Sequence, residues 1–151
     1  MYDKILVPID GSATSTRGLN EAIDLARQLK SQLVLLTVVD DFPMTVEMAS
    51  VSAFNETRAI LVEHGKKVLE EGRTTVSNAG LACETVLSEV MSQRPADSIV
   101  QEAAKRACNL IVMGTHGRRG FNRMALGSDA ELVLRQAPVP VLLVRSPTPR
   151  P

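Results

Sequence analysis

The fold follows from residues 4–39, KILVPIDGSATSTRGLNEAIDLARQLKSQLVLLTVV. Residues 5–9 are a short β-rich run closed by Asp10-Gly11-Ser12, which indicates a strand that enters a loop. Apolar residues then recur at the spacing of a helix face, namely Leu19, Ala22, Ile23, Ala26 and Leu29. Residues 33–39 are almost continuously apolar, as in a parallel strand covered on both faces. The stretch therefore predicts a β-α-β unit.

The same alternation continues to the end of the chain. We expect the first helix to start at a Thr14 or Ser15 cap and to end near Lys30. After a loop-like stretch from Asp40 to about Asn55, the pattern predicts helices over 56–76, from Pro95 onward and over 129–136, and strands over 81–89, 110–113 and 141–144. Strands that alternate with helices predict an α/β fold, a Rossmann-like open parallel sheet with helices on both faces. Ligands bind such sheets beyond the carboxyl ends of the strands, so the loops after the first and fourth strands form the candidate site.

Length and charge narrow the possible functions. The 151 residues suit a single domain, which we place at 1–146, followed by a proline-rich tail at 147–151. Seventeen Lys and Arg balance seventeen Asp and Glu, which argues against a broad surface for nucleic acid or an anionic membrane. No apolar run approaches the ~18 residues of a membrane span, and no signal peptide is evident. We expect a cytoplasmic protein.

The loop at residues 114–128, GTHGRRGFNRMALGS, carries the clearest chemical signal. It lies between a predicted buried strand and a predicted helix, and it contains three arginines and no acid. Its glycines allow the backbone amides to converge on an anion, and the helix that follows adds unsatisfied amides and the positive end of a dipole. These features predict a phosphate-binding loop. The spacing fits neither a P-loop, which ends in Gly-Lys-Ser/Thr, nor Gly-x-Gly-x-x-Gly.

The glycine spacing of this loop resembles that of the universal stress protein family. Gly114-2x-Gly117-9x-Gly127-Ser128 is similar to the glycine motif of the ATP-binding members, and similar segments stand at 4–12 and 137–144. The resemblance covers essentially the whole chain. It implies five parallel strands in the order 3-2-1-4-5, ATP as ligand, and a homodimer formed through the last strand, Val141–Val144.

The resemblance also implies which residues meet the nucleotide. Adenine would lie near Pro8, Asp10 and Val38 or Val39. Met113 and Gly114 would lie beside the adenosine, and Gly117, Gly127 and Ser128 would meet the phosphates. Three further candidates follow from their places in the loop, and they are His116, Arg118 and Asp129.

Several of these residues have a structural alternative. Ser128 and Glu131 match a capping box, in which the serine serves helix stability alone. Asp10 could cap a turn with Gly11 and Ser12. His116 could simply line the loop.

Asp129 suits the helix dipole, yet it would repel a phosphate unless Mg²⁺ or the neighbouring arginines compensated the charge. Nucleotide binding would then depend on the metal.

Two function classes remain. The first is an ATP-binding stress-response protein in which nucleotide occupancy acts as a switch towards an unidentified protein partner. We assign no catalytic residue, and we assign no residue as a metal ligand. Any hydrolysis of ATP should therefore be slow. The alternative is a dimeric interaction module of the same fold that binds no nucleotide. A nucleotidyl-transferring enzyme is less favoured, because neither His-x-Gly-His nor Ser-Gly-Gly-x-Asp-Ser occurs.

Overall fold

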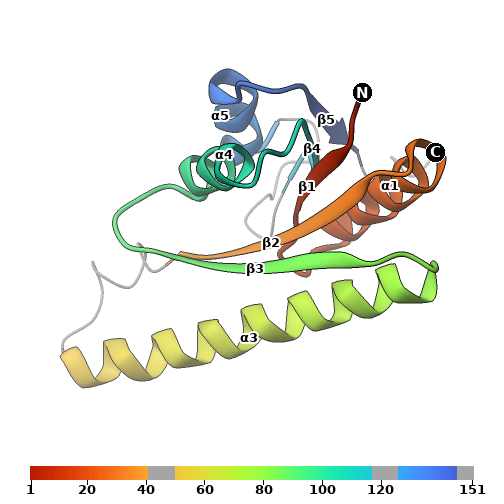
Figure 1. The fold of residues 1–151 in the computed structure, drawn as a ribbon. Helices are drawn as coiled ribbons and strands as arrows, with labels where there is room; N and C mark the ends of the chain where they lie inside the picture. The colour runs from red at the N-terminus through yellow and green to blue at the C-terminus, as the bar shows by residue number, and fades with distance from the viewer. Residues whose placement is uncertain (41–49, 117–125, 146–151) are drawn as a thin grey trace, which may run out of the picture.

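Five parallel strands form one sheet in the computed structural model, which describes residues 1–40, 50–116 and 126–145 (Figure 1). The strands are β1 (Lys4–Pro8), β2 (Gln32–Asp40), β3 (Cys83–Val90), β4 (Leu110–Gly114) and β5 (Val141–Val144). Their order is β3-β2-β1-β4-β5, which confirms the order that the family resemblance implied. β3 and β5 therefore form the two edges, and the strand order reverses between β1 and β4.

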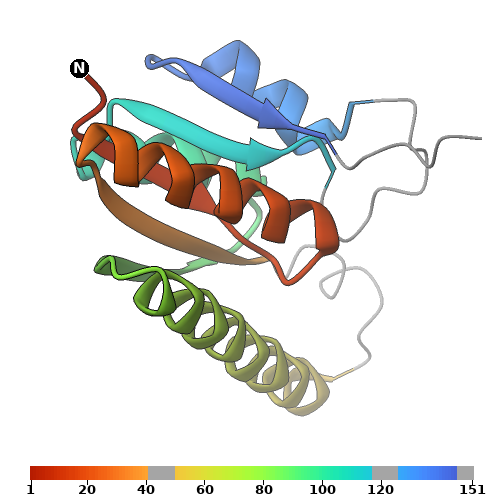
Figure 2. The same ribbon diagram turned by 90° about the vertical axis from the view of Figure 1, so that its right-hand side faces the viewer.

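In the described part of the chain, four helices cover the sheet on both faces, as predicted. They are α1 (Ala13–Leu29), α3 (Val51–Asn78), α4 (Pro95–Lys105) and α5 (Ser128–Gln136). α1 and α3 pack on one face, and α4 and α5 pack on the other (Figures 1 and 2). Each pair closes its own hydrophobic core against the central strands. No helix in the described ranges combines the length and apolar composition that crossing a bilayer requires.

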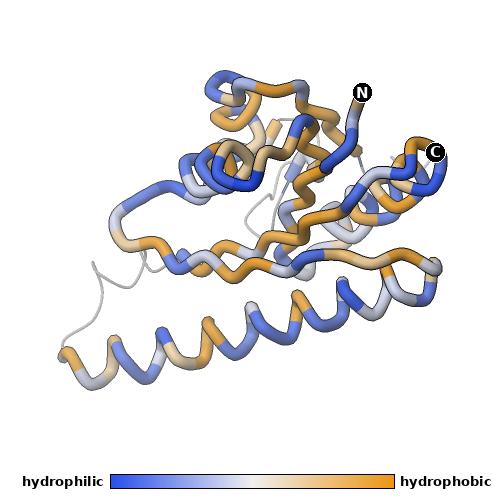
Figure 3. Tube along the Cα trace, viewed as in Figure 1, coloured by the Kyte–Doolittle hydropathy of each residue, from blue (hydrophilic) through white to orange (hydrophobic). Residues whose placement is uncertain are grey.

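The central strands are hydrophobic on both faces because helices cover both. Ile5, Leu6 and Val7 of β1 are fully buried, and alternate residues face opposite cores. Figure 3 shows the resulting hydrophobic colouring along β2, whereas α3 alternates between hydrophobic and hydrophilic positions. Along α3, Gly65 and Gly72 allow close approach to the sheet, since a Cβ on Gly65 would lie 2.8 Å from Leu87 Cδ1. This packing holds the carboxyl ends of the strands in fixed positions.

The helix starts differ from the predictions. α1 begins at Ala13, and its cap is Ser12, whose Oγ accepts a hydrogen bond from the Ser15 amide at 3.1 Å, so the Thr14 or Ser15 cap was wrong. The spacing of the apolar face could not distinguish neighbouring hydroxyl residues. α3 begins at Val51 behind a Ser50 cap, so the predicted loop through Asn55 was too long.

Three stretches of the prediction fall outside the described residues, namely 41–49 of the first loop, 117–125 of the glycine-rich loop and the tail at 147–151.

Candidate functional site

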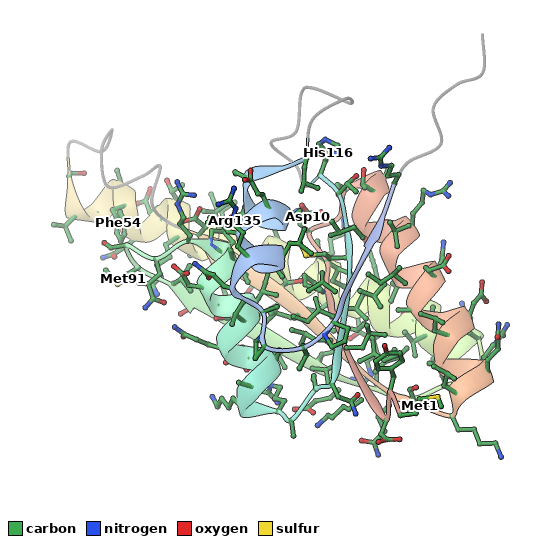
Figure 4. The ribbon with its side chains drawn as sticks, turned by 90° about the horizontal axis from the view of Figure 1, so that it is seen from above. Met1, Asp10, Phe54, Met91, His116 and Arg135 are labelled. Atoms are coloured by element: carbon green, nitrogen blue, oxygen red, sulfur yellow. The ribbon has the colours of Figure 1, made fainter. Side chains whose placement is uncertain are left out.

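A cavity of about 650 Å³ opens beyond the carboxyl ends of β1, β2 and β4, where the strand order reverses. Every predicted site residue that the structure describes lines this cavity: Pro8, Asp10, Val38, Val39, Met113, Gly114, His116, Gly127, Ser128 and Asp129. Gly117 and Arg118 lie outside the described residues. In Figure 4, Asp10 and His116 lie near each other, away from Met1. The fold thus brings residues more than a hundred positions apart around one space.

Asp10 occupies the turn between β1 and α1. Its Oδ1 accepts a hydrogen bond from the Ser12 amide at 2.9 Å, and Gly11 between them has a φ of 81°, a conformation that favours glycine. Asp10 therefore does cap the turn, as the structural alternative predicted. The same carboxylate also lines the cavity, so the turn fixes Asp10 where a ligand would meet it.

The end of β2 is tied to β1 beyond the paired strands. Thr37 Oγ1 donates a hydrogen bond to the Ile9 carbonyl at 2.9 Å, and the Ile9 amide donates to the Leu36 carbonyl at 2.8 Å. Val38 packs with the core under α4 and α5, whereas Val39 faces Gly65 of α3. The two valines consequently give the cavity apolar walls from opposite faces of the sheet.

Gly114 and Gly127 are required by close backbone contacts. A Cβ on Gly114 would lie 2.7 Å from Thr14 Cγ2 and 2.9 Å from its carbonyl oxygen. A Cβ on Gly127 would lie 2.9 Å from the Thr115 carbonyl oxygen. The Gly127 amide donates a hydrogen bond to that same oxygen at 2.9 Å, which brings the start of α5 against the end of β4.

The first turn of α5 faces this cavity. Gly127 is the N-cap residue and Ser128 the first helical residue, so Ser128 does not cap the helix through its side chain. Glu131 instead pairs with Arg135, with 2.8 Å between Oε1 and Nη2. The capping-box alternative was therefore wrong, because the helix begins at Ser128, one residue earlier than the motif assumed.

The first turn of α5 therefore lines the cavity with the N-terminus of a helix, which can hold an anion.

The charge of the described cavity wall is acidic. Asp10, Asp40 and Asp129 line it, together with His64 and His116, and none of its described residues is a lysine or arginine. His116 Nδ1 lies 3.0 Å from Thr115 Oγ1 within hydrogen-bonding distance. A polyphosphate in this cavity would therefore need positive charge from a metal ion or from residues outside the described ranges.

No protein-only metal site is present in the described ranges, where no three His, Cys, Asp or Glu side chains form a group that could hold a cation. A cation held by the described residues would consequently need further ligand oxygens, from water or from a bound molecule. One or two carboxylates combined with phosphate oxygens are a usual environment for Mg²⁺.

Sequence reasoning missed the wall that α3 supplies. Thr57, Leu61, His64, Gly65 and Val68 all line the cavity. These positions recur at helical spacing and could have been recognised as one face, but nothing in the sequence shows that α3 runs past the strand ends. Pro95 and Ile99 of α4 complete the opposite side.

The sequence matches one protein family over almost its whole length. A model of the universal stress protein family matches residues 1–145. Universal stress protein MJ0531 of Methanocaldococcus jannaschii is 34% identical over 147 residues, covering 97% of this chain and 84% of that protein. Universal stress protein YxiE of Bacillus subtilis is 30% identical over 151 residues, covering 96% of this chain and 100% of that protein.

Solved structures agree with the sequence match. The structure of MJ0577 from M. jannaschii superposes with a TM-score of 0.86 at 28% identity, covering 98% of this chain and 99% of that one. Two more distant structures share the fold, one of a universal stress protein in complex with cAMP (TM-score 0.70, 23% identity, 97% and 99% covered) and one from Archaeoglobus fulgidus in complex with dAMP (TM-score 0.68, 22% identity, 95% and 98% covered). This chain belongs to the universal stress protein family.

Proposed function

We propose that this protein binds an adenine nucleotide, with ATP as its ligand, and that occupancy of the site rather than turnover carries its signal in a stress response. The observation that carries the proposal is the cavity of about 650 Å³, in which predicted base-contacting and phosphate-contacting residues line one space at the switch point of the sheet. The adenine complexes of two proteins with this fold, with cAMP and with dAMP, support the same class of ligand.

Two groups of lining residues suit the two parts of a nucleotide, its base and its phosphates. Apolar side chains of Pro8, Val38 and Val39 would face the base, and the Asp10 carboxylate would accept hydrogen bonds from amino or hydroxyl groups of the nucleoside. The first turn of α5, with Ser128 at its start, would receive a phosphate. Gly117 and Arg118 would complete the phosphate end.

Charge predicts that Mg²⁺ accompanies ATP. Asp129 lies in the first turn of α5 and lines the cavity, where its carboxylate would repel a nearby phosphate. A divalent ion bridging Asp129 and the phosphates would remove the repulsion. We expect ATP to bind at least tenfold more tightly with Mg²⁺ than in EDTA; equal affinity in a calorimetric titration would contradict this role of Asp129.

Hydrolysis should be slow, because the sequence contains no Walker-type metal site and no residue that we assign as a water-activating base. We also propose a homodimer through β5, an edge strand on which Leu142 is exposed. We further propose that the protein is cytoplasmic and that a protein partner recognises its nucleotide-bound state.

A second function is favoured by the acidic cavity wall. With Asp10, Asp40 and Asp129 facing the cavity, the protein could be an interaction module that holds no nucleotide in the cell. The two functions are separated by denaturing freshly purified protein and identifying released small molecules by mass spectrometry. Release of a near-stoichiometric adenine nucleotide supports the nucleotide switch. Its absence, together with no binding of added ATP and Mg²⁺, supports the interaction module.

A further inference from the structure

Helix α3 forms one wall of the cavity, and none of the residues predicted to contact the nucleotide lies on this helix. Thr57, Leu61, His64 and Val68 follow one another at steps of four, three and four residues, and all four line the cavity. His64 also lines a second, smaller cleft of about 360 Å³ between α3 and the turn after β1. Asp10, His64 and Val68 are shared by both spaces. His64 thus stands beside the end of the cavity that Asp10 marks.

The hydroxyl donors on this side of the cavity are already used. Ser15 Oγ donates to the Ser12 carbonyl at 3.0 Å. Thr37 Oγ1 donates to the Ile9 carbonyl at 2.9 Å, and Thr57 Oγ1 donates to the Ala53 carbonyl at 2.9 Å. Each hydroxyl has a single hydrogen to donate, so these three groups can offer a ligand only their acceptor oxygens.

The charged side chains that share the larger cavity with His64 are acceptors, whereas Lys67 lines only the smaller cleft and pairs with Glu71 at 3.9 Å. Asp10 and Asp40 are acceptors when ionised. Within the described ranges, no protein group is seen to engage the His64 ring in a hydrogen bond or ion pair. An imidazole always carries at least one N–H donor. Among the described side chains of α3 that line the larger cavity, His64 is consequently the one that can donate to a ligand.

The geometry points to His64 as a specificity-determining residue that donates a hydrogen bond to the nucleoside part of the bound nucleotide. A nucleoside offers both ring-nitrogen and ribose-oxygen acceptors, as well as amino and hydroxyl donors. His64 would satisfy an acceptor, while the Asp10 carboxylate would satisfy a donor. The phosphates would lie at the other end, against α5. This inference rests on the nucleotide site proposed above.

The test compares ATP and adenosine as ligands of the whole protein in calorimetric titrations. His64→Ala should weaken both by the same factor, about 3- to 10-fold, as expected for one lost hydrogen bond. His64→Gln keeps a side-chain N–H donor and should recover most of the affinity. His64 is exposed on a helix, where alanine is favourable, so both variants should fold, which thermal unfolding verifies.

Glu63→Ala is the matched control, because Glu63 is the adjacent exposed residue of α3 and pairs with Lys66 away from the cavity. It should leave both affinities unchanged. Unchanged affinity in His64→Ala, or a loss with ATP alone, overturns the role of His64 while the nucleotide site stands. Failure of the wild-type protein to bind either ligand overturns the proposed function and the role of His64 together.

Discussion

At the scale of single residues, Gly114 and Gly127 shape the site because glycine has no Cβ atom. Each glycine allows two segments of backbone to touch, Gly114 against Thr14 and Gly127 against Thr115. The glycine spacing was visible in the sequence, and it suggested a loop that wraps an anion. The structure adds that both glycines also join β4 to the starts of two helices.

The two cysteines provide a residue-level prediction. Burial raises the pKa of the Cys108 thiol, against the lowering effect of Lys4 and Arg106, and burial likewise raises the pKa of Cys83. A raised pKa leaves little thiolate at pH 7, so alkylation by iodoacetamide should be slow and should accelerate as the pH rises to 9.

Cys83 is partly accessible and Cys108 is buried, so mass spectrometry should find Cys83 modified first. Denatured protein, in which both thiols react alike, is the control. Equal rates in the native protein at pH 7 would contradict the burial of Cys108.

At the scale of elements, the helix caps differ in how much structure depends on them. Ser12 caps α1 at the edge of the site, where its carbonyl also accepts the Ser15 hydroxyl and the Thr16 amide. Ser50 caps the exposed end of α3. Ser12 therefore orders the turn that holds Asp10, whereas Ser50 orders a helix end remote from the core.

Ser12→Ala should lower the free energy of unfolding by about 1 to 2 kcal/mol, the upper part of the range for a lost cap. Ser50→Ala makes the same chemical change and should cost only about 0.5 kcal/mol or less, because the α3 terminus can fray alone. Urea unfolding of the two variants measures the difference. Equal losses would show that the two caps support structure equally.

Helices and strands were predictable where burial in the core leaves a regular pattern of apolar residues. The residues at which the helices begin were not predictable. The runs at 33–39 and 141–144 predicted β2 and β5 because strands in a parallel sheet are apolar along their length. The start of α3 was missed because Val51, Phe54 and their neighbours extend past the sheet, where no core imposes an apolar face. The cavity wall that contains His64 lay inside the predicted helix, but the local pattern does not show where that helix packs relative to the strand ends.

The start of α5 was missed for a related reason. Ser128 and Glu131 satisfy the capping-box pattern, but the hydrogen bond from the Gly127 amide to the Thr115 carbonyl fixes where the helix begins. That tertiary contact joins the start of α5 to the end of β4, and the local sequence around Ser128 does not reveal it.

At the scale of the whole molecule, the formal charge of zero conceals an uneven distribution. The described cavity wall is acidic, while three arginines lie in the segment 117–125, outside the described residues. The strand order also places β3 and β5 at the edges, and it sets β1, β2 and β4 around the cavity. The proposed ligand site and the proposed dimer contact therefore use different parts of one sheet.

Self-association through β5 is testable with one charge. Leu142 is 37% exposed on this edge strand, and Leu142→Lys should convert a dimer to a monomer, because a lysine on an edge strand opposes pairing between strands. Ile60→Lys, on the outer surface of α3, should leave the dimer intact. Sedimentation velocity at micromolar concentration measures both. A monomeric wild-type protein, or a dimeric Leu142→Lys variant, would exclude this interface.

The central claim is that an adenine nucleotide binds against the Gly127–Ser128 start of α5. The most direct measurement is a calorimetric titration of nucleotide-free wild-type protein and of Gly127→Val with ATP and Mg²⁺, because a Cβ at Gly127 would lie 2.9 Å from the Thr115 carbonyl and must displace the start of the helix. Gln136→Ala, at the exposed far end of α5, is the control for folding and helix content. We predict saturable binding by the wild type and the control, and affinity at least tenfold weaker in Gly127→Val. Equal ATP affinity in all three proteins would contradict a phosphate site at this helix.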